Sequence, residues 1–228
     1  WDFFFPLPSP ENDIDFLNDW GHQEGSQFMI NDIWTVRASY FVRLKKELPT
    51  TSGEESTFWE RFSFHPDAIL YYSESHARIY KPEVLEGIHF IWNFDAHHDA
   101  YSTINEVIAS GVVTCQDWVS AVTYNNIKVK NFFPRWKTWD LQGKAAVPYQ
   151  HDNGKKFQLP FRSVFVCRSG AWTPIWIDEK FWDFIEKCPV KDKINLDDIS
   201  PRQFSMEKVR ELGKEFETLQ SGVSIDKK

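Results

Sequence analysis

The sequence predicts an α/β protein with a mostly parallel central sheet. Short apolar runs rich in aromatic and β-branched residues alternate along the chain with segments of helical periodicity. The 228 residues, 42% of them hydrophobic, are enough for one domain with a substantial core. We therefore expect a single domain over residues 1–228, with residues 1–27 as a covering segment and residues 221–228 as a flexible tail.

In the first half of the chain, the expected elements follow from spacing and composition. Apolar side chains of residues 30–48 fall on one face of a helix. Strands are expected where aromatic and β-branched runs stand between polar or turn-forming residues. The expected elements are a helix at 30–48, a strand at 67–72, a turn or short helix at 82–87 and a strand at 89–94.

In the second half, Thr114 and Asp117 have the spacing of a capping box, which predicts a helix over residues 115–124. Residues 137–160 contain two glycines and two prolines and predict a long irregular connection, of a kind that often acts as a lid. The other expected elements are helices at 104–109 and 178–187, strands at 128–133 and 163–167, and a final amphipathic helix after residue 201.

Composition excludes several classes of protein. The net charge of -7, without a basic stripe, argues against nucleic acid as a partner. No apolar stretch approaches about 18 residues, so no membrane span is expected. Three cysteines are too few for a disulfide framework and favour a reducing, cytoplasmic location. Because 17% of the residues are aromatic, we expect some to line a cleft or a partner surface.

Two acids and a histidine stand together in Phe94-Asp95-Ala96-His97-His98-Asp99, directly after the strand expected at 89–94. If the chain stays extended, Asp95, His97 and Asp99 point to one side. Such a set can hold a divalent metal, or two metals if the carboxylates bridge. The alternative is a charged turn whose histidines are satisfied by hydrogen bonds.

Two other expected strands also end in polar residues, with Glu74 and His76 after one and Cys167 and Ser169 at the end of the other. In parallel sheets, ligands lie beyond the carboxyl ends of the strands. If the three strands are neighbours, their ends form one site.

The motif residues 95–99 resemble the Asp-Ala-His-x-Asp signature of the arginase/ureohydrolase superfamily. Residues 71–76, 116–119, 133–136 and 167–174 are similar to segments of its small atypical peptide arginases, and the resemblance spans roughly residues 70–185. It implies an arginase-like three-layer fold and a dinuclear manganese (Mn2+) site whose bridging hydroxide attacks a guanidinium carbon. It also implies conversion of arginine residues in a ribosomally made precursor peptide to ornithine, with release of urea.

Carried over by the resemblance, Asp95 and Asp99 would bridge the metals, and His97 and His76 would each bind one of them. Two departures stand out. The family's Gly-Gly-Asp before the first histidine is Ser-Glu-Ser here, and the family's late Ser-x-Asp-x-Asp has no clear match. Either Cys167, at the end of the late strand, replaces an aspartate ligand or the acid comes from elsewhere. The candidates for that acid are Asp140, Asp152 and Asp178.

Three further residues are candidates for substrate binding and proton transfer. Glu74 could bind the cationic guanidinium, or it could pair locally as a surface glutamate. His98 or His151 could protonate the leaving amine, with a structural or solvated histidine as the alternative in each case. For Cys167, a buried apolar thiol and a metal ligand are both open, and a nucleophile is least favoured.

We therefore expect a metal-dependent hydrolase that converts arginine in a peptide to ornithine and urea. The alternatives are an agmatinase-like or amide hydrolase on the same scaffold, and a catalytically inactive protein that binds a peptide through its aromatic surface.

Overall fold

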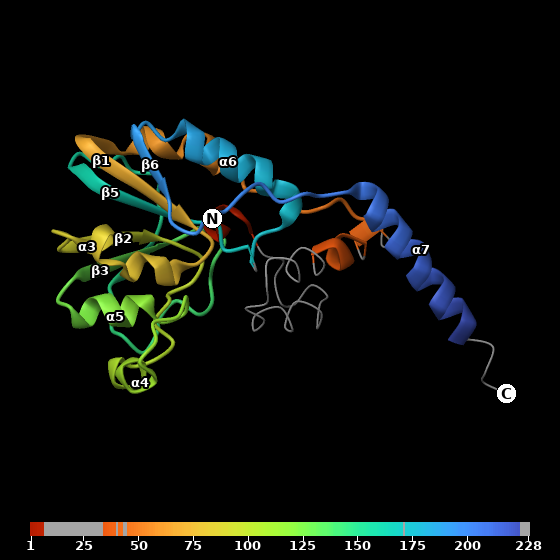
Figure 1. Ribbon diagram of the computed structural model, residues 1–228, viewed down its shortest axis with the longest axis horizontal. Helices are drawn as coiled ribbons and strands as arrows, with labels where there is room; N and C mark the ends of the chain where they lie inside the picture. The colour runs from red at the N-terminus through yellow and green to blue at the C-terminus, as the bar shows by residue number, and fades with distance from the viewer. Residues whose placement is uncertain (7–33, 40, 43–44, 171, 224–228) are drawn as a thin grey trace. The chain divides into compact units, whose positions relative to one another are not determined.

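The computed structural model describes residues 1–6, 34–39, 41–42, 45–170 and 172–223 (Figure 1). The described chain is mixed α/β and divides into two compact units. The first comprises Trp1–Ser9, Thr51–Ser169 and Lys180–Ser200, and the second comprises Pro10–Thr50, Gly170–Glu179 and Pro201–Lys228. All the described strands belong to the first unit.

The first unit contains two three-stranded parallel sheets. In one sheet, β1 (Ser63–Ser73) lies between β5 (Pro160–Cys167) and β6 (Asp192–Asn195). In the other, β3 (Lys128–Phe133) lies between β2 (Phe90–Phe94) and β4 (Tyr149–His151). The prediction of parallel strands is confirmed. The prediction of one central sheet is not, because no ladder joins β2 to β5 in the described chain.

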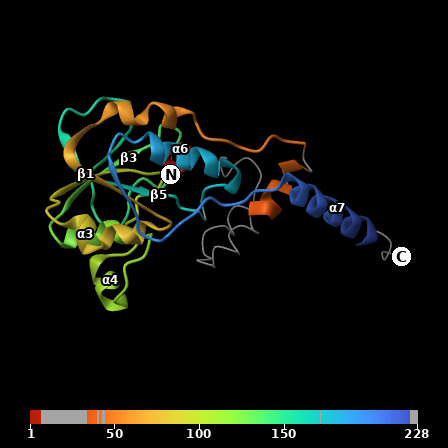
Figure 2. The ribbon, with the colours of Figure 1, turned by 45° about the horizontal axis from the view of Figure 1, so that its top comes forward.

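Helices connect the strands and cover their faces. Figure 1 shows α6 along the sheet of β1 and α5 along the sheet of β3, and Figures 1 and 2 both place α4 at the periphery. The α-helices are α3 (Pro82–Leu85), α4 (Ile104–Ser110), α5 (Trp118–Tyr124), α6 (Asp178–Lys187) and α7 (Met206–Val223). The 3-10 helices are η1 (Asp2–Phe4), η3 (Glu54–Ser56), η4 (Phe58–Arg61), η5 (His76–Tyr80) and η6 (Ile175–Ile177). No described helix has the length and apolarity needed to cross a membrane.

The core of the first unit has two parts. On one side, Val119 and Val122 of α5 belong to the same buried apolar cluster as Tyr71 of β1 and Val129 of β3. On the other side, aromatic rings meet mostly edge to face, an arrangement that ring quadrupoles favour. The aromatic cluster includes Trp1, Phe3, Phe4, Phe58, Phe62, Phe94, Phe157, Phe161 and Phe184.

In the second unit, the indole of Trp34 packs against Ile175 and lies edge-on to Trp176, with ring centroids 5.4 Å apart. Nearby, the buried Arg202 guanidinium donates to both Asp178 and the carbonyl of Thr173. Residues 34–39 and 41–42 are helical, in agreement with part of the helix expected at 30–48. The remainder of that helix, most of the covering segment and residues 224–228 lie outside the described residues.

Several element boundaries differ from expectation for local reasons. The helix expected at 115–124 begins at Trp118, because the Asp117 carboxylate binds Thr114 and the Ser102 amide instead of capping α5. The reciprocal capping box belongs to α4, between Thr103 and Glu106. Strand β1 starts four residues early and contains a register shift, which accommodates the proline within it.

Candidate metal centre

A first group of possible metal ligands consists of His76, Asp95 and Asp99. His76 begins η5, shortly after β1, and both acids follow β2. The carboxyl ends of β1 and β2, one strand from each sheet, therefore meet here. His76 Nδ1 lies 2.9 Å from Asp99 Oδ2, and His76 Nε2 lies 3.4 Å from Asp95 Oδ2. The structure thus brings together two of the strand ends that the sequence analysis expects to converge.

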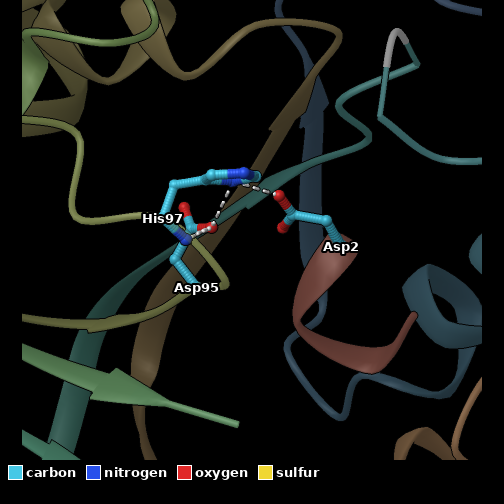
Figure 3. Close-up of side chains that lie close together, drawn as sticks. All are labelled: Asp2, Asp95 and His97. Atoms are coloured by element: carbon cyan, nitrogen blue, oxygen red, sulfur yellow. Dashed lines mark hydrogen bonds and ion pairs between the residues drawn. The ribbon is translucent and has the colours of Figure 1, made fainter. Parts of the chain in front are cut away.

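A second group consists of Asp2, Asp95 and His97 (Figure 3). His97 Nδ1 lies 2.8 Å from Asp2 Oδ2 and 3.7 Å from Asp95 Oδ1. The backbone N–H of His97 donates to Asp95 Oδ1 at 2.9 Å. Figure 3 shows Asp2 reaching these residues from η1. Asp95 therefore belongs to both groups, whereas Asp99 belongs to the first alone.

Burial and unmet hydrogen bonding show that these residues fit cations. Asp2, Asp95 and Asp99 are all buried. Asp2 Oδ1 and Asp95 Oδ2 are shielded from solvent, and neither accepts a hydrogen bond from a residue that the structure describes. A buried carboxylate oxygen without a donor is costly, and a cation would remove that cost. Carboxylate oxygens with imidazole nitrogens suit divalent manganese, iron or zinc. Each group offers three ligand atoms, and both groups include Asp95.

The protonation of the centre follows from its crowded charges. Burial alone would lower the pKa of His76, but the Cys167 thiol and the two carboxylates beside it raise this pKa well above its usual value. Burial opposes the same effect at His97, where hydrogen bonds to Asp2 and Asp95 raise the pKa to about 10. Burial and the charge of Asp2 raise the pKa of Asp95 to about 6. Without cations, protonated histidines therefore balance the buried acids.

The motif residues 95–99 form a turn and not an extended strand. Strand β2 ends at Phe94, and the amide of Asp95 still donates to the Phe132 carbonyl at 3.3 Å. Asp99 has a φ of +48°, a left-handed conformation that aspartate tolerates better than most residues. The side-chain alternation that the sequence analysis expects is wrong. The turn instead brings Asp95 and Asp99 to the same histidine.

His98 lies next to the motif's ligands, but it is bound elsewhere. Its Nδ1 accepts from the Ala100 amide at 3.0 Å, so the proton lies on Nε2, which donates to Asp140 at 3.2 Å. The imidazole also packs against the ring of Tyr101, with centroids 4.1 Å apart. The structure places His98 beside Asp140 and outside both ligand groups.

Glu74 and His151 are also placed outside the two groups. The Glu74 carboxylate pairs with the fully buried guanidinium of Arg168, whose Nε donates to it at 2.7 Å. His151 ends β4, and its Nε2 lies 2.7 Å from the Lys137 carbonyl. In the described chain neither residue contributes a donor atom to the groups formed around Asp95.

Cys167 lies beside the centre without joining it. Its Sγ is within 3.2 Å of the Glu74 carbonyl and of Ser169 Oγ. The thiol is buried, and it influences His76 electrostatically. Cys167 is absent from both groups of donor atoms that lie within 4.8 Å of one another.

The acids proposed as substitutes for the late aspartates all have other partners. Asp140 binds His98, Asp152 binds Arg61 and Asp178 binds Arg202.

Sequence reasoning missed Asp2, whose carboxylate joins Asp95 and His97 in the second group of possible ligands. Its one signal was an acid inside the aromatic run Trp1-Asp2-Phe3-Phe4-Phe5. In the structure this run is buried, and Phe3, Phe4 and Phe5 are each at most 3% exposed. A charged residue within a buried aromatic run needs a partner, and here it has His97.

Comparisons with protein-family models, with curated proteins and with solved structures yield no match to this chain.

Proposed function

We propose that this protein is a divalent-metal-dependent hydrolase that cleaves the guanidinium group of arginine residues in a peptide. Water and the arginine side chain would give urea and an ornithine side chain. The observation that supports the proposal best is the position of Asp95, whose carboxylate is shared by two histidine–aspartate groups. A shared carboxylate is what a two-metal hydrolase requires of its bridging ligand.

The residues have separate roles in this proposal. Asp95 would bridge two cations, with His76 and Asp99 completing one position and Asp2 and His97 the other. Bound cations would supply a hydroxide nucleophile at neutral pH by lowering the pKa of water. The guanidinium carbon is a poor electrophile because of resonance, so the chain must hold it close to that nucleophile.

Substrate choice rests on charge and on the resemblance to peptide arginases. Three buried carboxylates around the centre and a net charge of -7 favour a cationic substrate. The resemblance supports a peptide, made as a ribosomal precursor, over free arginine. Glu74 would have to give up its ion pair with Arg168 to bind the substrate guanidinium.

The proposal is tested by incubating arginine-containing peptides with the protein and manganese, and following their mass. We expect a decrease equal to CH2N2 for each converted arginine, together with urea. Asp95→Asn should abolish the conversion. Asp67→Asn is the matched control, because the Asp67 side chain is 90% exposed and lies outside both ligand groups.

Other outcomes would favour the alternatives. Urea released from free agmatine or arginine, but not from peptides, would indicate an enzyme of small amidines. A protein that binds peptides, retains no manganese after dialysis and leaves their mass unchanged would be a binding protein, and the hydrolase proposal would be rejected.

A further inference from the structure

An apolar cavity of about 190 Å³ separates the two sheets of the first unit. Five consecutive residues from each of two strands line it, residues 90–94 of β2 and residues 163–167 of β5. Successive side chains of a strand point to opposite faces. A cavity that touches every residue of a stretch therefore runs along the edge of the strand, where the backbone lies.

Both strands have one edge unused along this cavity. Within the described chain, β2 pairs only with β3, and β5 pairs only with β1. Strands of parallel sheets are normally internal and covered on both faces. Here residues 91–94 and 163–165 are only half-buried, and Phe90 is exposed. Two facing edges thus leave backbone N–H and C=O groups available for a partner.

The cavity is apolar on both sides of the strand plane. Ile91 and Phe165 pack against the buried cluster that includes Val84 of α3. Trp92 and Phe94 pack with the aromatic cluster, and the rings of Trp92 and Phe161 lie 4.9 Å apart. An occupant would therefore meet apolar side chains above and below and backbone polar groups at both flanks.

An extended polypeptide matches the two strand edges and the two apolar faces of the cavity together. An apolar small molecule would fill the volume, but it would leave the backbone groups of both edges without partners. A strand would satisfy both edges and bury its side chains on both faces. Trp1 lines the cavity, and its backbone nitrogen donates to the carbonyl of Cys167, the last residue of β5, at 2.7 Å. A strand joined to this nitrogen would therefore run parallel to β5.

We propose that the cavity is a binding site for one extended apolar peptide strand, parallel to β2 and β5, whose carboxyl end lies at Trp1. Its binding would join the two sheets into one continuous parallel sheet. The inference concerns the sheets alone, and it holds whether or not the ligand groups bind cations.

The test supplies such a strand to the full chain by a peptide bond to the amino side of Trp1, which gives it a high effective concentration. The strand is a pentapeptide of valine and isoleucine. The control pentapeptide is all proline and cannot donate ladder hydrogen bonds to either strand. Hydrogen exchange of the β2 and β5 amides is then compared between the two proteins, with β6 as an internal reference.

We expect the β2 and β5 amides to exchange about tenfold more slowly with the valine–isoleucine strand than with the control, as one or two net hydrogen bonds would produce. Equal exchange in the two proteins would overturn the inference. Slowing confined to β6 would overturn it as well, because a strand in the cavity contacts β2 and β5. Manganese content is measured on the same samples, so failure of the hydrolase proposal is scored separately.

Discussion

The indole N–H of Trp118 donates a 2.6 Å hydrogen bond to the Asp99 carboxylate. Trp118 is the first residue of α5 and is buried, so the bond connects the helix that covers the second sheet to the ligand group of His76. The same oxygen, Asp99 Oδ2, lies 2.9 Å from His76 Nδ1. The orientation of one proposed ligand therefore depends on the position of a helix.

Replacing Trp118 by phenylalanine should weaken metal binding, because the variant keeps a ring but loses the donor. Residues that orient metal ligands typically contribute about 10- to 100-fold in metal affinity. Titration with manganese measures the change. Trp136→Phe is the matched control, since the buried Trp136 indole nitrogen has no hydrogen-bond partner among the described residues. Equal affinities in the two variants would show that Trp118 does not orient Asp99.

The two groups predict a difference in stoichiometry between Asp2→Asn and Asp95→Asn. Asp2 belongs to one group, so its variant should retain one manganese per chain, in the group of His76. Asp95 belongs to both, so its variant should retain none. Elemental analysis after dialysis gives the numbers, with Asp67→Asn as the control. Two cations in Asp2→Asn would remove Asp2 from the centre.

Cys167→Ser should reduce manganese affinity less than Asp99→Ala does. The Cys167 thiol lies outside both ligand groups, and a soft thiolate is a poor ligand for manganese. Asp99 supplies an oxygen directly to the group of His76. Calorimetric titration of both variants gives the order, and the reverse order would make Cys167 a principal ligand.

Metal affinity should increase with pH between about 6 and 10, and binding should release protons. Both limits come from the centre, where the pKa of Asp95 is about 6 and that of His97 is about 10. Below its raised pKa, His97 holds a proton that a cation must displace, so competition decreases as the pH rises. Titrations in buffers of different ionisation enthalpy count the protons. A pH-independent affinity would contradict this account.

Glu74→Gln separates two roles for that residue. Arg168 is fully buried, and Glu74 is its carboxylate partner, so loss of the charge should lower the free energy of unfolding by about 3 kcal/mol. Denaturant unfolding measures this. If Glu74 instead binds the guanidinium of the substrate, the variant should keep its stability and show a raised KM for arginine peptides.

Much of the fold could be predicted because it depends on local pattern. Strand β3 and helix α6 have the bounds that their sequences predict, since polar or turn-forming residues flank clear apolar patterns. The short strands β4 and β6 were missed, because three or four residues give no readable alternation. The division into two sheets could not be predicted either, because pairing between distant strands leaves no mark in a single sequence.

Most of the residues of the candidate centre, but not all of them, could be predicted. The three motif residues Asp95, His97 and Asp99 stand within five positions, and His76 follows a recognisable strand, so sequence patterns identify all four. Asp2 joins His97 across 95 positions, and only packing brings the two together. The local conformation was also beyond prediction, since the left-handed φ of Asp99 depends on the fold around it.

Asp2 stands on a single 3-10 turn whose neighbouring rings, Phe3 and Phe4, are embedded among other aromatic side chains. No strand ladder of the described chain holds this acid in place. Aromatic packing and two backbone hydrogen bonds, from Trp1 to the Cys167 carbonyl and from Ser52 to the Phe4 carbonyl, set its distance from His97. Cation binding at His97 would consequently be lost when heating loosens these contacts. On warming, this position would empty first, while the position at His76, anchored through α5, would still be filled.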